Sequence, residues 1–154
     1  MKISLGADER TPVVDFVLDE LIRAGHSVTY HGPRSGDSQP VAENSWPMVA
    51  RQVAEDVAGS RSQEGILFCW TGTGVSMAAN KVHGIRAALC ADAETARGAR
   101  LWNNANVLCL SLRTTALPVA REILQAWFGT SYKPNPSDDA SLKLLDDLDN
   151  SRKG

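Results

Sequence analysis

The stretch at residues 65–81 constrains the fold more than any other, because an apolar run breaks into glycines there before a helical pattern begins. Residues 66–68 form a short, continuous apolar run, the pattern of a strand buried on both faces of a parallel sheet. The residues from Val75 to Lys81 are compatible with a helix. The stretch therefore predicts a strand, a tight loop and a helix in succession.

Cys69 stands at the carboxyl end of the predicted strand, and Gly72 and Gly74 lie in the loop that follows it. Glycine tolerates positive φ, so the backbone N–H groups of such a loop can converge on one point and bind an anion. The N–H groups and dipole at the start of the helix would point to the same place. The alternative is a small buried cysteine beside an ordinary turn. The close spacing of thiol and glycines favours a functional site.

Two familiar glycine loops do not fit this stretch. The dinucleotide motif Gly-x-Gly-x-x-Gly fails because its third position, counted from Gly72, is Met77. The nucleotide phosphate loop fails because Gly-Lys-Ser/Thr is missing. Neither a dinucleotide nor a nucleoside triphosphate is therefore the expected ligand.

Composition narrows the class of protein and ligand further. A chain of 154 residues with 43% hydrophobic residues is expected to form one globular domain. A net charge of −2 without a basic cluster argues against nucleic acid or an anionic membrane as a partner, so a small ligand is expected. No apolar stretch approaches the roughly 20 residues of a membrane span, and the N-terminus leads directly into a strand. We expect a cytoplasmic protein.

The three cysteines, Cys69, Cys90 and Cys109, each lie in or at the end of an apolar run and lack the spacing of metal ligands. We therefore expect neither disulfides nor a zinc site.

Strand-like and helix-like segments alternate about five times along the chain with no internal repeat, which predicts an α/β fold with a doubly wound parallel sheet. Ligands bind such sheets at the carboxyl ends of the strands. The expected strands are residues 3–5, 27–31, 66–68, 87–91 and 106–112, and the expected helices are residues 13–22, 46–57, 75–81, 93–102 and 118–128.

Asp8 and Arg113 both follow expected strands and would meet Cys69 at this edge of the sheet. Asp8 could instead cap the next helix, and Arg113 could be a solvated loop charge, although its bidentate guanidinium suits phosphate. Residues 34–45 form the longest irregular segment, and one hypothesis makes them a lid. Trp46, which opens the next helix, could line the pocket or fill the core, and the core is the expected place.

The C-terminal segment differs in character from the rest of the chain. Residues 133–136 contain two prolines and form an extended break, and residues 141–150 predict a final helix with leucines among aspartates. Few apolar residues lie nearby to cover those leucines, so we expect this helix to reach a partner subunit. The expected organisation is one α/β domain at residues 1–132 and a linker, helix and tail at residues 133–154.

Residues 65–81 resemble the ribose-5-phosphate isomerase B and galactose-6-phosphate isomerase family, whose motif is Gly-Ile-Leu-x-Cys-Gly-Thr-Gly-x-Gly-x-Ser-x-Ala-Ala-Asn-Lys. The likeness continues through residues 84–88, Asn103 and residues 106–113, and covers most of the chain up to Phe128. The resemblance implies a Rossmann-like fold and metal-free, cofactor-free aldose–ketose isomerisation of a phosphosugar through an enediolate. It also implies a homodimer, or a dimer of dimers, with active sites at the subunit interface.

Carried over from the family, Cys69 is the expected proton-transferring base and Asp8 a ligand of a substrate hydroxyl. The loop at residues 70–74 is the expected enediolate cradle, with Thr71 assigned to catalysis beside Cys69. The remaining substrate-binding candidates are Glu9, Trp70, Gly72, Thr73, Gly74, Trp102, Asn103 and Arg113.

Four departures mark the chain as a divergent relative. The family's Asp-His pair is Asp8-Glu9 here, and the glycine after the catalytic cysteine is Trp70. Trp102 replaces the histidine that opens the sugar ring. The C-terminal Gly-Gly-Arg-His segment, whose arginines hold phosphate in the family, is replaced by residues 133–136 and an acidic helix. Arg113 is what remains of that phosphate site, with Arg10 or Lys133 as candidate helpers.

These departures leave two hypotheses. The first is an isomerase of a different phosphosugar, such as a tetrose or tetrulose phosphate, which is too short to cyclise and needs no ring-opening acid. If the substrate were cyclic, Glu9 would be the candidate acid. The second is a non-catalytic paralogue that binds a sugar or sugar phosphate, or serves as the partner subunit of an active enzyme.

Overall fold

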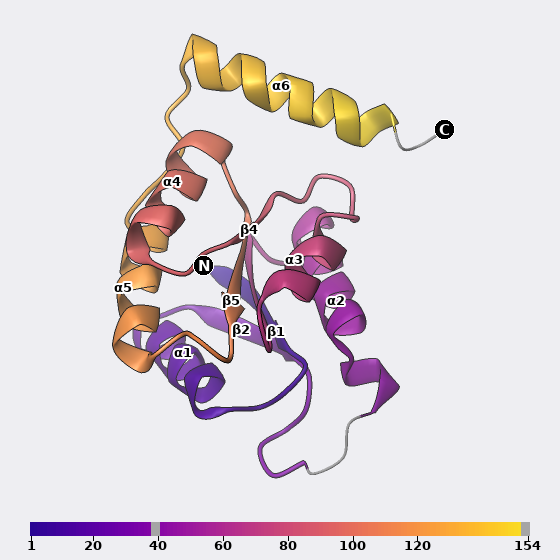
Figure 1. Cartoon of the computed structure of the whole chain (residues 1–154), viewed down its shortest axis with the longest axis vertical. Coiled ribbons are helices and arrows are strands. Elements are labelled where there is room, and N and C mark those ends of the chain that lie inside the picture. Colours follow the sequence, from indigo (N-terminus) through magenta and orange to yellow (C-terminus); the bar gives the residue numbers. More distant parts are fainter. Residues whose placement is uncertain (38–40, 152–154) are drawn as a thin grey trace.

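A five-stranded parallel sheet forms the centre of the molecule, in a computed structural model that describes residues 1–37 and 41–151 (Figure 1). The strand order is β2-β1-β3-β5-β4, and every neighbouring pair is parallel. This confirms the predicted doubly wound sheet. The strands are β1 (Lys2–Ala7), β2 (Ser27–His31), β3 (Glu64–Cys69), β4 (Ala87–Leu89) and β5 (Val107–Ser111).

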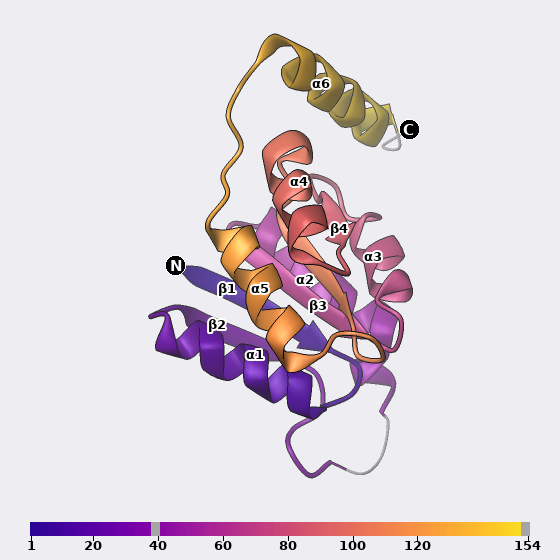
Figure 2. The same ribbon diagram turned by 60° about the vertical axis from the view of Figure 1, so that its left-hand side comes forward.

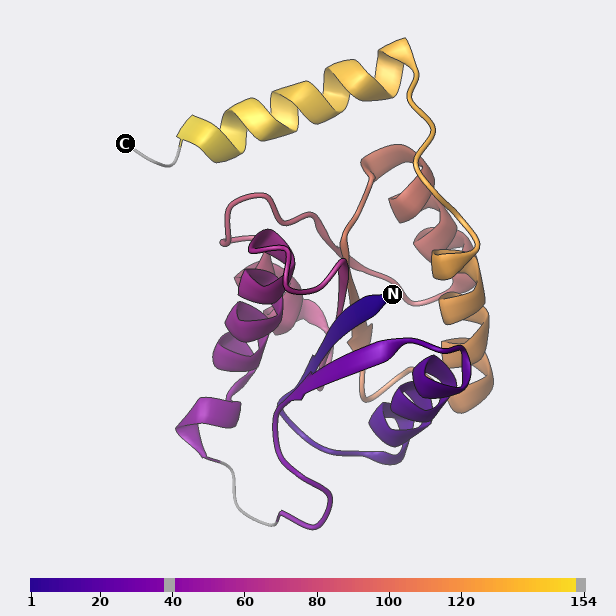
Figure 3. The ribbon, with the colours of Figure 1, turned by 180° about the vertical axis from the view of Figure 1, so that it is seen from behind.

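Helices cover both faces of the sheet, and Figures 1 and 2 show α1, α4 and α5 on one side and α2 and α3 on the other. The last helix, α6, lies beyond the amino ends of the strands, joined to α5 by an extended segment (Figures 2 and 3). The helices are α1 (Pro12–Arg23), α2 (Trp46–Ala58), α3 (Thr73–Ala79), α4 (Ala93–Asn103), α5 (Leu117–Phe128) and α6 (Pro136–Asn150), with a 3-10 helix η1 at Ala42–Asn44.

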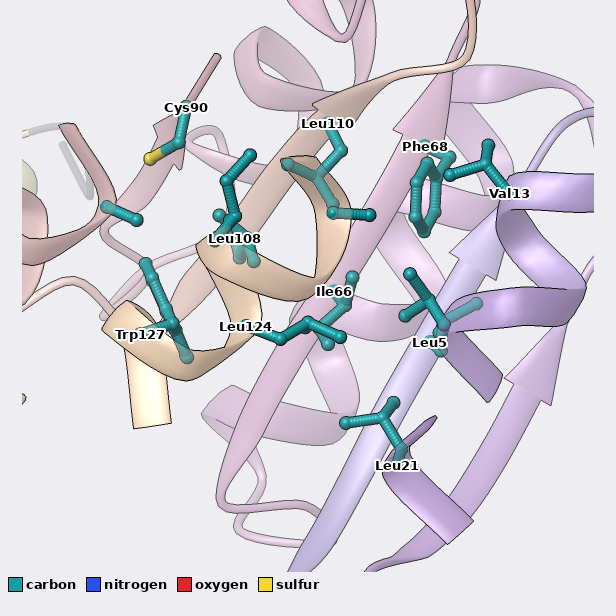
Figure 4. Close-up of a cluster of buried hydrophobic side chains, with 14 of the residues drawn as sticks. Leu5, Val13, Leu21, Ile66, Phe68, Cys90, Leu108, Leu110, Leu124 and Trp127 are labelled. Carbon is teal, nitrogen blue, oxygen red and sulfur yellow. The ribbon is translucent and has the colours of Figure 1, made fainter. Parts of the chain in front are cut away.

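Each face of the sheet has its own hydrophobic core because the central strands alternate their side chains between two layers of helices. The core under α1, α4 and α5 is the larger, and Figure 4 shows Ile66 and Leu108 near Leu124 of α5, and Phe68 beside Val13 of α1. Residue Leu67 points to the other core, with Val53 of α2. Burial of each such side chain contributes about 1.5–3 kcal/mol.

A polar network closes the amino edge of the sheet. Glu64, the first residue of β3, accepts hydrogen bonds from Arg100 Nη2 at 2.6 Å and from Trp127 Nε1 at 2.5 Å. Arg100 also donates to the Ala105 carbonyl. Burial raises the pKa of Glu64, and the charge of Arg100 and the two hydrogen bonds oppose that rise. The network ties the start of β3 to both α4 and α5.

Several predicted boundaries are wrong by a few residues. Helix α3 begins at Thr73 rather than at residue 75, and β4 ends at Leu89 rather than at residue 91. Helix α6 begins at Pro136, five residues before the predicted start, because Asn135 caps it by accepting a hydrogen bond from the Asp138 N–H at 3.0 Å.

The lid hypothesis concerned residues 34–45, of which residues 38–40 lie outside the described residues. In the parts of the chain that the structure describes, no helix is long and apolar enough to cross a membrane.

Candidate active site

A pocket of about 350 Å³ opens at the carboxyl ends of β1 and β3. It brings together several of the residues predicted from the sequence, which reach it from the end of β3, the loops after β1 and β3, the start of α2 and helix α3. Its lining residues are Asp8, Trp46, Cys69, Trp70, Thr71, Thr73, Gly74 and Met77.

Cys69 is the last residue of β3 and is only 5% exposed, yet it lines this pocket. Its backbone carbonyl accepts hydrogen bonds from the N–H of Gly72 at 3.2 Å and from the N–H of Leu112 at 3.0 Å. Both the loop after β3 and the end of β5 therefore hold the thiol-bearing residue in place.

Gly72 makes the tight loop possible for two independent reasons. Its φ is +74°, in the left-handed region that glycine adopts without strain. A Cβ at this position would lie 2.5 Å from Leu89 Cδ1 and 3.0 Å from the Leu110 carbonyl. No other residue fits without a backbone shift, and Gly72 caps α3 so that the first N–H groups of the helix, which lack intrahelical partners, start beside the pocket.

The rest of the loop is held through its backbone, while its side chains are exposed. The carbonyl of Trp70 accepts hydrogen bonds from the Arg113 N–H at 3.0 Å and from Ser111 Oγ at 2.9 Å, whereas its indole ring is exposed. The hydroxyl oxygens of Thr71 and Thr73 lie 2.6 Å apart. The backbone of the loop is thus fixed, and its side chains remain available to a ligand.

Asp8 follows β1 and projects one carboxylate oxygen, Oδ1, into a buried position without any hydrogen-bond partner. Burial raises the pKa of Asp8, its own backbone N–H opposes the rise, and the charge of Glu9 adds to it. Asp8 does not cap the next helix, because Thr11 is the N-cap residue of α1. An unsatisfied buried acceptor in a pocket is a group prepared for a ligand. Glu9 is exposed and is not among the pocket-lining residues.

Arg113 lies just past β5, next to the pocket through its backbone hydrogen bond to Trp70. Within the described residues its guanidinium forms no hydrogen bond or ion pair, so it is free to bind an anion. Arg10, by contrast, donates to Asp15 at 2.6 Å and lies over the Tyr30 ring.

Trp102 and Asn103 lie elsewhere in the chain. Helix α4 runs back from the carboxyl ends of the strands, so its last turn reaches the opposite edge from Cys69. The two residues line a separate groove of about 600 Å³, which follows α4 back to Leu89 at the end of β4. Within one copy of the chain, Trp102 and Asn103 therefore do not line the pocket that contains Cys69.

Trp46 was expected in the core, and this prediction is wrong. It is 42% exposed, lines the pocket, and its ring lies where a Cβ on Gly74 would come within 3.0 Å. The helical spacing to the buried Val49 and Ala50 favoured the core, but burial on α2 begins only at Val49, and Trp46 at the start of the helix lies beside Gly74 of α3. Met77, on the exposed side of α3, carried no signal in the sequence.

No cluster of three or more histidine, cysteine or acidic residues that could hold a metal ion is found within residues 1–37 and 41–151.

Comparison with known proteins gives consistent matches over nearly the whole chain. The galactose-6-phosphate isomerase subunit LacB of Clostridium acetobutylicum is 34% identical, over 100% of this chain and 87% of that protein. The D-erythrulose-4-phosphate isomerase of Pectobacterium atrosepticum is 36% identical, over 86% of each protein. The structure of ribose-5-phosphate isomerase B from Clostridium thermocellum superposes with a TM-score of 0.90 at 30% identity, covering 99% of both chains.

The sequence model of one family, Ribose/Galactose Isomerase, matches residues 3–143. That match includes the strand, glycine loop and helix around Cys69, together with Asp8, Trp102, Asn103 and Arg113. With both the sequence and the fold in agreement, the chain belongs to the Ribose/Galactose Isomerase family.

Proposed function

We propose that this chain is an aldose–ketose isomerase that acts on a small phosphosugar by proton transfer through an enediolate. The observation that carries the proposal is the pocket that Cys69 and the glycine loop of residues 70–74 line together with Asp8, whose Oδ1 has no hydrogen-bond partner. Moving a carbonyl between adjacent carbons requires one group that carries a proton and donors that stabilise the oxyanion. Cys69 is the carrier, and the loop, including Thr71, supplies the donors.

The proposed substrate is a four-carbon sugar phosphate. Bulky Trp46 and Trp70 narrow the pocket, and a relative of similar identity is named for D-erythrulose 4-phosphate. Trp102 stands where the family has its ring-opening histidine, and an indole has one N–H donor and no proton to transfer near neutral pH. A sugar phosphate too short to cyclise needs no such acid. The free guanidinium of Arg113 is the proposed phosphate ligand.

The proposed active form is a homodimer, or a dimer of such dimers, in which a second copy brings Trp102 and Asn103 to the Cys69 pocket. The separation of the two hollows within one chain supports this. Residues 1–132 form the proposed isomerase unit, and residues 133–154 form an arm.

Helix α6 of that arm supports the same assembly. Three of its leucines are exposed, Leu144 by 66%, Leu145 by 45% and Leu148 by 63%, whereas Leu142 is half-buried. Its hydrogen bonds to the loop before β4 run from the Gly84 N–H to Asp149 at 2.7 Å and between His83 and Asn150 at 2.9 Å. Covering the leucines with a second copy would contribute about 1.5–3 kcal/mol for each if burial were complete. Deleting residues 136–154 should therefore shift sedimentation towards the monomer, and unchanged monomers for both proteins would refute the dimer.

We place this enzyme in the cytoplasm, with neither nucleic acid nor membrane as a partner. The free state of Cys69, Cys90 and Cys109 supports a reducing compartment.

The decisive assay compares turnover of D-erythrose 4-phosphate with that of ribose 5-phosphate by the purified protein. The proposal expects a higher kcat/KM for the four-carbon substrate. Faster turnover of ribose 5-phosphate would overturn the substrate assignment while leaving the isomerase reaction intact.

The loss of the family histidine at Trp102 favours a second candidate, a non-catalytic binding paralogue or partner subunit. Incubating the protein with either sugar phosphate in heavy water separates the two. Deuterium appearing at C1 or C2 would exclude the non-catalytic candidate. Binding without exchange would favour it over the isomerase.

A further inference from the structure

Aldose–ketose isomerisation relocates two protons. One leaves carbon C2 and reaches C1, and the other leaves the oxygen on C2 and reaches the oxygen on C1. A thiol that carries the carbon-bound proton holds it during the enediolate stage. A second acid–base group is therefore required for the proton on oxygen.

Among the residues that line the pocket, two carry ionisable side chains, Cys69 and Asp8. The other lining side chains are hydroxyls, indoles, a thioether and a glycine, none of which releases a proton near neutral pH. Trp102 and Asn103, which a second copy is proposed to bring, carry no acid, and Glu94 in the same groove pairs with Arg97 at 3.2 Å.

The three histidines and Glu9 are the other acid–base groups considered for this proton, and each lies outside the pocket lining. His31 donates to Asp56 at 2.7 Å, His26 lies 3.3 Å from the N-terminal amine, and His83 lies 2.9 Å from Asn150. Glu9 is exposed and outside the pocket lining.

Asp8 has the geometry that the second transfer needs. Its Oδ1 is buried without a partner, so it can meet a substrate oxygen without first breaking a hydrogen bond. A carboxyl group has two oxygens, one of which can accept a proton while the other donates one. Burial, which raises the pKa of Asp8, makes the protonated form easier to reach.

We propose that Asp8 relays the hydroxyl proton between the two oxygens of the enediolate while Cys69 moves the carbon proton. Asp8 accepts the proton from the C2 hydroxyl as the C2 carbonyl forms, and it delivers a proton to the oxygen on C1 as that oxygen loses its enolate character. Asp8 ends in its starting state, and no oxidant or reductant takes part. The inference rests on the proposed isomerase function.

The test uses Asp8→Asn, which keeps the shape of the side chain but removes the relay, with Asp19→Asn on the exposed face of α1 as the matched control. Each full-length protein is incubated with D-erythrose 4-phosphate in heavy water. Two rates are measured at saturating substrate, formation of the ketose and appearance of deuterium at C2 of the remaining aldose.

The relay predicts that ketose formation by Asp8→Asn falls about 100-fold or more. It predicts that deuterium exchange stays within about tenfold of the wild-type rate, since Cys69 still removes the C2 proton. Asp19→Asn should match the wild type in both rates.

Equal losses of both rates in Asp8→Asn would overturn the relay and leave Asp8 as a binding group. Unchanged ketose formation would overturn it as well. Absence of both activities in the wild-type protein would instead refute the isomerase function on which the relay depends.

Discussion

Buried acids at the amino ends and at the carboxyl ends of the strands differ in whether they have hydrogen-bond partners. At the amino edge, Glu64 is held by Arg100 and by Trp127. At the carboxyl edge, Asp8 has a buried oxygen without a partner, next to Cys69. Buried polar groups ordinarily find partners because an unsatisfied one costs about 1–3 kcal/mol. The contrast indicates that the amino edge is built for stability and the carboxyl edge for a ligand.

The largest effect on stability is expected at the amino edge. Glu64→Ala leaves Arg100 without its buried partner, and breaking such a pair costs about 3–5 kcal/mol. Urea denaturation should show a correspondingly lower free energy of unfolding. A loss below about 1 kcal/mol would mean that the network contributes little and would remove one half of the comparison.

Trp102→Ala tests whether the groove residue serves the site. If the indole only stacks on an acyclic substrate, KM should rise by the equivalent of about 1–3 kcal/mol while kcat changes little. Steady-state kinetics with D-erythrose 4-phosphate provides both values. A collapse of kcat at unchanged KM would show that Trp102 takes part in the chemistry.

Asp56 provides a satisfied acid to compare with Asp8. Burial opposes its ionisation, but hydrogen bonds from His31, Arg61 and Ser4 outweigh burial and lower its pKa. A lowered folded-state pKa means that the stabilisation is present above the ordinary value of about 4 and is lost as pH falls through the folded pKa.

Asp56→Asn should therefore destabilise the protein by about 1–3 kcal/mol at neutral pH. It should also make the free energy of unfolding less sensitive to acid below about pH 4. Thermal unfolding across pH measures both effects. If the variant lost stability below about pH 4 as steeply as the wild type, Asp56 would not be the cause of that loss.

Asp8→Asn should raise the free energy of unfolding, whereas Asp56→Asn lowers it, and its effect should be the smallest of these. The raised pKa means that ionised Asp8 costs stability as pH rises through that pKa. Removing the charge should raise stability at neutral pH by about 0.5–2 kcal/mol, a gain often found when a functional group is removed. A loss of stability would show that Asp8 is part of the structural network.

The sequence predicted the fold well because the apolar run in β3 and the glycine loop are local patterns with one common outcome. It also placed Asp8, Cys69 and Arg113 at one edge, since parallel strands bring their carboxyl ends together. Trp46 was assigned wrongly because helical spacing does not reveal where along a helix burial begins. The unsatisfied oxygen of Asp8 depends on neighbours distant in the chain, so no sequence pattern could predict it.

The most direct test of the account is the exchange of the substrate's C2 hydrogen with solvent by Cys69→Ser, compared with Cys109→Ser. A serine hydroxyl does not ionise near neutral pH, so exchange should fall by about 100-fold or more while binding of the sugar phosphate survives. Cys109 is buried in the core and should affect only stability. Equal losses of exchange in both variants would contradict the account, because Cys69 would then be a structural residue.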